Sequence, residues 1–367
     1  MPHWEALHIE RFRRLENLRL DDLGTVNLLV GKNNSGKTSV LEALAIASHP
    51  TSALQWIDVG RERELKSART PLLEVLGWFF PHQRPRENGF EGTSALSGNL
   101  SGGGKVSIRA EYKEFRQVKM TPEPEEGAEF AEDEFSDFAA TLEISVEKEP
   151  CDLLEGFMQA FPVIYEFSGK SFKDVGSAAR LLPCQFISPV SHRTSRHLLA
   201  GVDQVLEERL KPQIVGLLQK LAPDVQDIEI RSPQGRGSVI QLYHEGIGHV
   251  PLAVEGDGMR RALAFASAAS LARNGVLLVD EIETALHPEA LAGIFRFLVH
   301  VCRETGIQLF VTTHSLEAVD AMLASMADDL GDLVAYRLPE RGSGVPTKRF
   351  GGQTLHDLRN EGGLDLR

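Results

Sequence analysis

The chain has 367 residues, of which 42% are hydrophobic and 25% are charged, a composition typical of soluble globular proteins with one large or two moderate domains. Its longest apolar runs are far shorter than the roughly 18 residues that span a membrane, and its first residues do not resemble a signal peptide. We therefore expect a cytoplasmic protein without a membrane segment. The three cysteines are scattered, which indicates a reducing compartment and predicts neither a disulfide framework nor a zinc site.

The net charge of −13 is unevenly distributed along the sequence. Eight acidic residues and no basic residue lie between Glu123 and Asp137. Because an acidic surface repels phosphate backbones, tight non-specific DNA binding by the chain alone is not favoured. A local basic groove, or one that a partner completes, stays open as an alternative.

The N-terminal part of the chain predicts a β-rich lobe. Residues 3–9 and 18–20 roughly alternate between apolar and polar, and residues 26–30 form an apolar run that predicts a buried strand. A helix is expected over residues 38–48, because Pro50 follows and stops it.

A glycine-rich sequence of the type G-x-x-x-x-G-K-[ST] lies between that strand and that helix. Gly31 and Gly36 allow backbone N–H groups at a helix N-terminus to surround an anion. Lys37 adds a positive charge for the β- and γ-phosphates, and Thr38 adds a hydroxyl for Mg²⁺. The flanking strand and helix disfavour a chance glycine turn, so the sequence predicts nucleoside triphosphate binding. The residues expected at the nucleotide are Gly31, Lys32, Asn33, Asn34, Ser35, Gly36, Lys37, Thr38 and Ser39.

The middle of the chain carries weaker signals. Residues 52–82 have helical patterning, and residues 82–103, rich in Gly, Ser, Asn and Pro, predict a loop. Alternation over residues 105–112 and 141–146 predicts an antiparallel hairpin, with the acidic segment 123–137 as its exposed excursion.

Further elements are expected before the second half of the site. Residues 151–160 predict a short helix, and residues 162–167 and 184–188 predict strands. Residues 195–221 predict one long amphipathic helix that Pro212 kinks. Its apolar face favours core packing over a partner surface.

A second strand that suits a phosphate site comes much later, at residues 275–279. Asp280 and Glu281 stand at its carboxyl end, where ligands bind in open α/β sheets. Asp280 is the candidate ligand of Mg²⁺, directly or through its water shell, and Glu281 is the candidate general base for the attacking water. An ordinary strand end with charged residues is the alternative, which the phosphate loop disfavours.

Two further segments flank that strand in the sequence. Gly256, Asp257 and Gly258 precede a helix expected over residues 262–272 and offer N–H groups to an anion, although alone they would indicate only a helix cap. His314 follows a buried strand expected over residues 308–313. A lone histidine there would more often be structural, but beside a nucleotide it is well placed to contact the γ-phosphate.

The order of these motifs resembles the ABC-type ATPase heads of the SMC, RecF and OLD (overcoming lysogenization defect) proteins. The segment Ile9–Leu15 ahead of the phosphate loop, Asp257–Arg261, Asp280–Pro288 and Thr312–Ser315 carry the likeness. These segments look most like the AAA-type ATPases of OLD and abortive-infection systems. The resemblance covers residues 3–48 and about 250–320.

The resemblance implies a role for each motif. Lys37 and Thr38 would belong to Walker A, Asp280 and Glu281 to Walker B, Glu283–His287 to the D-loop, and His314 would be the switch. Gly256, Asp257 and Gly258 would be a signature that reaches the ATP of a second copy, so a head-to-head homodimer with ATP and Mg²⁺ at its interface is expected. Asp257 stands where these families often place serine. Gln185 or the segment 188–193 is the candidate Q-loop. Arg13 would approach the nucleotide or be a solvated surface arginine.

We therefore expect an α/β fold of the ABC-type P-loop ATPase head, with a β-rich N-terminal lobe, a mixed or parallel sheet with flanking helices, and a mid-chain α+β insertion. The expected division is residues 1–50 for the first half of the head, 51–240 for the insertion, and 241–367 for the second half. The 53 residues after His314 are too few for the Toprim nuclease domain of long OLD proteins. The resemblance is therefore to a freestanding head with a separate effector polypeptide.

Three functions fit this expectation. The favoured one is a Mg²⁺-dependent ATPase that gates a nuclease or toxin in anti-phage defence. The second is a RecF- or SMC-like ATPase of DNA repair or recombination that binds DNA across the closed dimer. The third is a nucleotide-dependent switch with negligible turnover, which Glu281 argues against because a switch has little use for a water-activating base.

Overall fold

The computed structural model describes residues 3–64, 70–81, 89–116, 138–149, 162–168, 171–173, 180–193, 195–207, 210–232, 237–340, 345–361 and 363. The chain divides into two compact units. The first contains Met1–Ala6, Leu20–Leu41 and Leu182–Arg367, and the second contains Leu7–Arg19 and Glu42–Leu181. This division differs from the expected one, because residues 182–240 belong to the unit that carries the phosphate loop.

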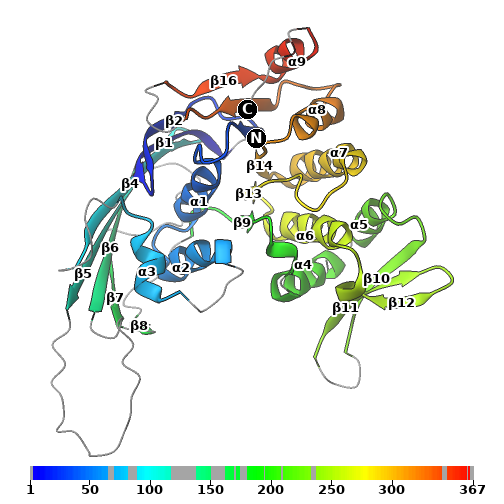
Figure 1. The fold of residues 1–367 in the computed structure, drawn as a ribbon, viewed down its shortest axis with the longest axis horizontal. Helices are drawn as coiled ribbons and strands as arrows, with labels where there is room; N and C mark the ends of the chain where they lie inside the picture. The colour runs from blue at the N-terminus through cyan, green and yellow to red at the C-terminus, as the bar shows by residue number, and fades with distance from the viewer. Residues whose placement is uncertain are drawn as a thin grey trace, which may run out of the picture. The chain divides into compact units, whose positions relative to one another are not determined.

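A six-stranded sheet forms the centre of the first unit (Figure 1). Its strand order is β16 (Lys348–Gly351), β15 (Leu333–Arg337), β3 (Val26–Val30), β14 (Gln308–Thr312), β13 (Val276–Val279) and β9 (Cys184–Ile187). The strands β15, β3, β14, β13 and β9 are parallel, and β16 is antiparallel to β15. Parallel strands end at the same edge of a sheet, so the loops that follow β3, β13 and β14 meet there. The expected mixed sheet is confirmed, and with it the predicted strands.

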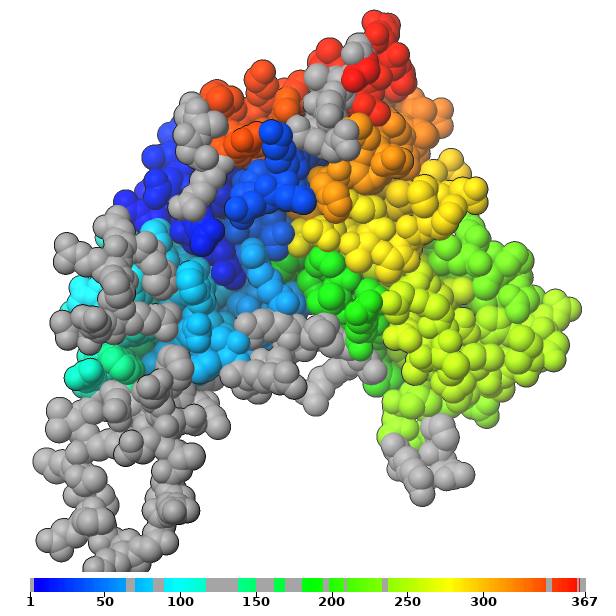
Figure 2. All heavy atoms as spheres, in the orientation of Figure 1, coloured from blue at the N-terminus to red at the C-terminus, as the bar shows by residue number. Residues whose placement is uncertain are grey.

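One face of this sheet is covered by helices. Alternate strand residues, among them Leu28, Val279 and Val311, belong to one buried core with the apolar faces of the helices. Neighbouring helices α6, α7 and α8 form adjoining bands of the surface, coloured yellow to orange (Figure 2). The helices of this unit are α4 (Ser195–Glu207), α5 (Lys211–Leu218), α6 (Asp257–Leu271), α7 (Pro288–Thr305), α8 (Leu316–Ser325) and α9 (Gly352–Asn360).

The single helix predicted over residues 195–221 is wrong. The structure has α4 and α5 in its place, with Leu210 as the N-cap of α5 and Pro212 in its first turn. Proline lacks a backbone N–H and has a fixed φ, so it fits the first turn of a helix and disrupts an interior. Pro212 therefore starts a second helix and does not kink a continuous one.

A three-stranded antiparallel sheet follows α5, which the sequence analysis did not anticipate. It consists of β10 (Val225–Arg231), β11 (Val239–His244) and β12 (Gly248–Pro251). Its buried residues Val225, Ile228 and Leu242 belong to the same core as α4 and α5. The 3₁₀ helix η6 (Leu252–Val254) then leads directly to Gly256.

A seven-stranded sheet provides most of the second unit. Its order is β2 (Leu15–Leu20), β1 (Trp4–Phe12), β4 (Glu91–Leu100), β5 (Gly104–Arg116), β6 (Phe138–Lys148), β7 (Val163–Ser168) and β8 (Ser171–Lys173). The predicted antiparallel hairpin is confirmed as β5 and β6, with Tyr112 opposite Leu142. Helices α2 (Ala53–Arg61), η1 (Glu62–Glu64) and α3 (Leu72–Gly77) agree with the helical patterning. The acidic segment 123–137 and the helix predicted over 151–160 lie outside the described residues.

The loop predicted over residues 82–103 is wrong for its described part, because Glu91–Leu100 form the strand β4. Ser94, Leu96, Gly98 and Leu100 are buried, so the segment does alternate, although its side chains are small. The turn to β5 places Gly102 and Gly103 at φ angles of 87° and 85°, which only glycine adopts readily. The alternating residues of 91–100, followed by Gly102 and Gly103, were therefore the signal for a β-hairpin that was missed.

Candidate functional site

The loop from Gly31 to Thr38 joins β3 to helix α1 (Lys37–Ser48). Gly31, Asn34 and Gly36 have φ angles of 140°, 66° and 94°, so the backbone turns sharply three times. A Cβ atom at Gly31 would lie 3.0 Å from the carbonyl oxygen of Leu338 and 3.1 Å from Ser35 Oγ. Glycine at this position therefore lets the backbone of the loop curl tightly at the helix N-terminus, the geometry that binds phosphate.

The side chains of Lys37 and Ser35 are placed where they could bind an anion in the loop. Lys37 is only 8% exposed, and its Nζ donates hydrogen bonds to the carbonyl oxygens of Gly31 at 2.7 Å and Lys32 at 3.0 Å. Burial lowers the pKa of Lys37, against the opposing charges of Asp280, Glu281 and Glu283. Among the described residues, the buried Ser35 Oγ has no hydrogen-bond partner. A bound phosphate would satisfy both groups, so the loop fits a nucleotide.

Thr38 and Asp280, the two predicted metal ligands, lie side by side. Thr38 Oγ1 donates to the two carboxylate oxygens of Asp280 at 3.1 and 2.9 Å. Asp280 is 4% exposed, and its Oδ1 also accepts a 2.6 Å hydrogen bond from Thr312 Oγ1. Oxygen donors of this kind suit a hard cation such as Mg²⁺. In the described part of the chain, no cluster of three or more His, Cys, Asp or Glu forms a metal site. A cation held by Thr38 and Asp280 would therefore complete its shell with phosphate and water.

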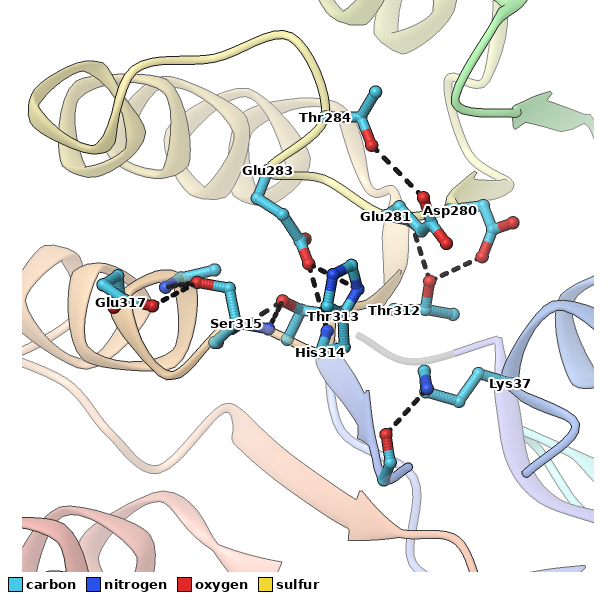
Figure 3. Close-up of polar contacts among 12 residues, drawn as sticks. Lys37, Asp280, Glu281, Glu283, Thr284, Thr312, Thr313, His314, Ser315 and Glu317 are labelled. Carbon is cyan, nitrogen blue, oxygen red and sulfur yellow. Dashed lines mark hydrogen bonds and ion pairs between the residues drawn. The ribbon is translucent and has the colours of Figure 1, made fainter. Parts of the chain in front are cut away.

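The strand pairing explains why Asp280 and Thr312 meet. Val279 of β13 is paired with Val311 of β14, so the residue after each lies at the same level. Thr312 Oγ1 also accepts a 2.8 Å hydrogen bond from the backbone N–H of Glu281 (Figure 3). One buried hydroxyl thus connects the predicted metal ligand to the predicted general base. Sequence reasoning missed Thr312, although the register of the two predicted strands could have indicated it.

The turn that starts at Glu281 has an unusual backbone. Glu281 and Ala285 have φ angles of 45° and 62°, in the left-handed region that non-glycine residues seldom occupy. The half-buried Glu281 side chain accepts a hydrogen bond from Thr284 Oγ1 at 3.3 Å, and the N–H of Thr284 donates to the Glu281 carbonyl oxygen. This turn holds the carboxylate of Glu281 next to Asp280, at the edge where the phosphate loop also lies.

His314 lies two residues beyond β14, at the same edge of the sheet. Its ring is 47% exposed, and its Nδ1 lies 3.0 Å from Glu283 Oε1 (Figure 3). The structure thus gathers Lys37, Thr38, Asp280, Glu281 and His314 around the carboxyl ends of three neighbouring strands.

Gly256, Asp257 and Gly258 form the start of α6. Gly256 is the N-cap, and a Cβ atom at Gly258 would lie 3.2 Å from the carbonyl oxygen of Ala285. Asp257 Oδ2 accepts a 3.1 Å hydrogen bond from Arg193, which holds the pKa of that carboxyl below its usual range. Within one chain, this segment, the predicted signature, therefore contacts the turn after β13.

The two Q-loop candidates differ in position. Gln185 lies within β9, opposite Leu277, whereas residues 188–193 follow the carboxyl end of that strand. Arg193 binds Asp257, and His192 is buried 3.8 Å from the same carboxylate. Burial and the charge of Arg261 lower the pKa of His192. The segment 188–193 thus has a direct connection to the signature helix.

Arg261 is a residue of this site that sequence reasoning missed. Its side chain is completely buried and donates to the carbonyl oxygens of Ser188 at 2.5 Å, Asp280 at 2.9 Å and Glu281 at 3.0 Å. Burial lowers its pKa to about 10, against the opposing charges of nearby carboxylates. The guanidinium therefore ties α6 to the ends of β9 and β13. Its spacing of four residues before the buried Phe265 was the available signal.

Arg13 belongs to the second unit. Its Nε lies 2.6 Å from Glu42 Oε2, its guanidinium lies 4.4 Å from the centre of the Phe79 ring, and Arg63 also binds Glu42. Glu42 is fully buried, and burial lowers the pKa of Arg13. Arg13 is thus part of a buried ion pair and not the solvated surface arginine of the alternative interpretation. Its approach to a nucleotide stays a prediction.

Two family models match the chain. One, described as an AAA ATPase domain, matches residues 5–152. The other, described as an AAA domain, putative AbiEii toxin, Type IV TA system, matches residues 176–320. Together they cover both halves of the site, the phosphate loop in the first and Asp280, Glu281 and His314 in the second.

Individual relatives agree with these models. An ATP/GTP phosphatase of Helicobacter pylori is 22% identical over 342 residues, which is 87% of each chain. The DNA replication and repair protein RecF of Saccharophagus degradans is 43% identical over 49 residues, 13% of each chain. The crystal structure of an SMC head bound to the C-winged helix domain of ScpA has a TM-score of 0.50 and 13% identity, over 96% of this chain and 99% of that one. The fold is that of an SMC head. In the described residues, no helix is long and apolar enough to cross a membrane.

Proposed function

Because the chain belongs to the AAA/ABC-type P-loop ATPases of the SMC, RecF and OLD group, we propose that it hydrolyses ATP in a site that two copies complete. The observation that carries this proposal is the contact of Thr38 with Asp280, beside Glu281. It brings a phosphate loop, a candidate metal ligand and a candidate base to one edge of the sheet.

Each residue has a definite task in this reaction. The loop N–H groups and Lys37 bind the β- and γ-phosphates, and Lys37 Nζ exchanges its two carbonyl acceptors for phosphate oxygens. Thr38 and Asp280 would hold Mg²⁺, which when bound neutralises charge on the phosphates. Glu281 accepts a proton from the attacking water, and His314 contacts the γ-phosphate.

The signature segment gives a reason for a second copy. Gly256–Gly258 is a helix start, where backbone N–H groups have no acceptor within the helix itself, and within one chain it packs on the turn after β13. We propose that two heads close face to face, so that this helix start of each copy meets the ATP of the other. Asp257 would then need its partner Arg193, since a bare carboxylate would repel the γ-phosphate.

The biological role proposed for this cycle is control of a separate effector in the cytoplasm, a nuclease or toxin of anti-phage defence. The family model with the AbiEii description supports this choice. ATP binding would close the dimer and hydrolysis would open it, so the effector would respond to the nucleotide state. A role in DNA repair or recombination is the second candidate, which the local similarity to RecF favours.

The test is the Glu281→Gln variant, which keeps nucleotide binding and removes the base. In light scattering with ATP and Mg²⁺ at micromolar protein, we expect a stable dimer that ADP does not support. Glu289→Gln, which changes an exposed glutamate at the start of α7, is the control and should hydrolyse ATP normally. A Glu281→Gln protein that stays monomeric with ATP would contradict the two-copy site.

The same variant distinguishes the two biological roles. Purified from its native host in the ATP-bound state, it should retain a nuclease or toxin if the defence role is right. Retention of recombination proteins and DNA would support the second candidate.

A further inference from the structure

Glu283 and His314 form a hydrogen-bonded pair between the loops that follow β13 and β14 (Figure 3). Glu283 Oε1 accepts the backbone N–H of His314 at 3.1 Å and lies 3.0 Å from its Nδ1. The Glu283 side chain is 15% exposed, whereas that of His314 is 47% exposed. The carboxylate is therefore the fixed member of the pair, and the imidazole is the accessible one.

This contact requires a proton on one nitrogen of the imidazole ring. An ionised carboxylate can only accept hydrogen bonds, so the Nδ1 that faces Glu283 must carry a proton. Nε2, on the other side of the ring, is then the nitrogen left for a ligand, and it donates to a phosphate oxygen when it too carries a proton, in the imidazolium form. Because the same oxygen also binds the backbone N–H of His314, the carboxylate fixes the ring and its loop together.

The loop that carries Glu283 is built to hold this carboxylate in place. It runs between the left-handed residues Glu281 and Ala285, and the Glu283 carbonyl oxygen accepts the N–H of Leu286. Glu283 Oε2 is buried and has no hydrogen-bond partner among the described residues. A buried acceptor without a donor is unfavourable, so this placement of Glu283 calls for a functional reason.

We propose that Glu283 is a positioning residue for ATP hydrolysis, which orients His314 so that its Nε2 is presented to the γ-phosphate. This inference rests on the proposed function, because that function makes His314 the phosphate contact. Glu283 itself touches no substrate and acts through the histidine ring. Glu317 provides a contrast, since its carboxylate accepts a hydrogen bond from the hydroxyl of Ser315, the N-cap of α8.

The first test needs no nucleotide. In protein labelled with ¹⁵N-histidine, the side-chain signal of His314 is identified by its loss in His314→Gln. We expect a protonated Nδ1 in the native protein and in Glu283→Gln, which keeps an oxygen acceptor. In Glu283→Ala the signal should change, because the acceptor is gone. The same His314 signal in the native protein and in Glu283→Ala would overturn the proposal, whether or not the protein hydrolyses ATP.

The second test measures single-turnover hydrolysis and ATP affinity. Glu283→Ala should lower kcat about 10-fold or more and leave the Kd for ATP within about twofold, as expected for the loss of an orienting contact. His314→Ala should lower kcat by as much, and the double variant should lower kcat no further than His314→Ala alone. Glu317→Ala is the control and should keep full activity. Independent, multiplicative losses in the double variant would overturn the proposal.

Discussion

The hydroxyl of Thr38 and the carboxylate of Asp280 are in hydrogen-bond contact across 242 residues of sequence. Their strands β3 and β13 are not neighbours, because β14 lies between them. The contact therefore depends on β14, whose last residue, Thr312, binds the same carboxylate. A site of this kind responds to changes in the middle strand as well as to changes in the phosphate loop.

Lys37→Ala should weaken ATP binding by about 100-fold, because it removes a charged hydrogen-bond donor to phosphate. Isothermal titration calorimetry with ATP and Mg²⁺ measures this. Lys113→Ala is the control, since Lys113 of β5 is also a lysine but is exposed and paired with Glu91. If Lys37→Ala bound ATP with unchanged affinity, the assignment of this loop as the ATP site would be wrong.

Thr312→Val should lower both activity and stability. The change keeps the side-chain volume but removes the shorter of the two hydrogen bonds to Asp280 Oδ1 and takes away the acceptor that Thr312 gives the Glu281 N–H. We expect the free energy of unfolding to fall by about 2 kcal/mol and kcat by about 10-fold or more. Urea unfolding and steady-state hydrolysis measure the two effects. Thr312→Ser keeps the hydroxyl and should recover most of kcat. Equal kcat losses in both variants would show that the hydroxyl is not the cause.

Gly201→Ala and Gly216→Ala should have opposite effects on stability. Gly201 of α4 packs against α6 so closely that a Cβ atom would lie 2.4 Å from Ser267 Cβ, so alanine should destabilise the protein by about 1–3 kcal/mol. Among the described residues, no atom lies within 4 Å of a Cβ at Gly216 of α5, so alanine there should stabilise the protein by about 0.5–1 kcal/mol. Chemical unfolding of both variants checks this. If Gly216→Ala were destabilised as much as Gly201→Ala, the close approach of α4 and α6 would not explain the lower stability of Gly201→Ala.

His244 should make stability depend on pH. Its 7% exposed ring lies between Asp224, 2.9 Å from Nδ1, and Glu255, 3.0 Å from Nε2. The hydrogen bond with Asp224 is the main cause of a raised pKa of His244, which burial opposes and the charge of Glu255 supports. A pKa that is higher in the folded than in the unfolded chain gives stabilisation that is complete below the unfolded value of 6.5 and is lost as pH rises through the folded value.

The measurement for His244 is urea unfolding of the native protein and His244→Gln between pH 6 and pH 9. The difference in the free energy of unfolding should be largest at pH 6 and should shrink as the pH rises. His249→Gln, in the neighbouring strand β12, serves as the control for loss of a histidine from this sheet. A difference that does not change with pH would refute the assigned interaction.

Apolar runs and glycines in the sequence predicted those parts of the site that form within one short segment of the chain. The strand, loop and helix around Gly31 and the strand before Asp280 follow from apolar runs and glycines, and the structure contains them. Arg261 and Thr312 were not predicted, because their roles come from which elements pack together. Strand β4 was missed for a related reason: most of its side chains are small, and it is a strand because it lies between β1 and β5 in the sheet.

The position of β3 in its sheet has a consequence for how the chain folds during synthesis. Val26 pairs with Leu309 on one side and Leu333 on the other, so β3 has no neighbour in its sheet until β14 has been made. At roughly 5–20 residues per second, about 15 to 60 s separate the synthesis of Val26 from that of Leu333. For most of that time the five residues of β3 lack both neighbouring strands, and β14 becomes available shortly before β15. The phosphate loop therefore follows a strand that is paired on both sides only after β14 and β15 have been made.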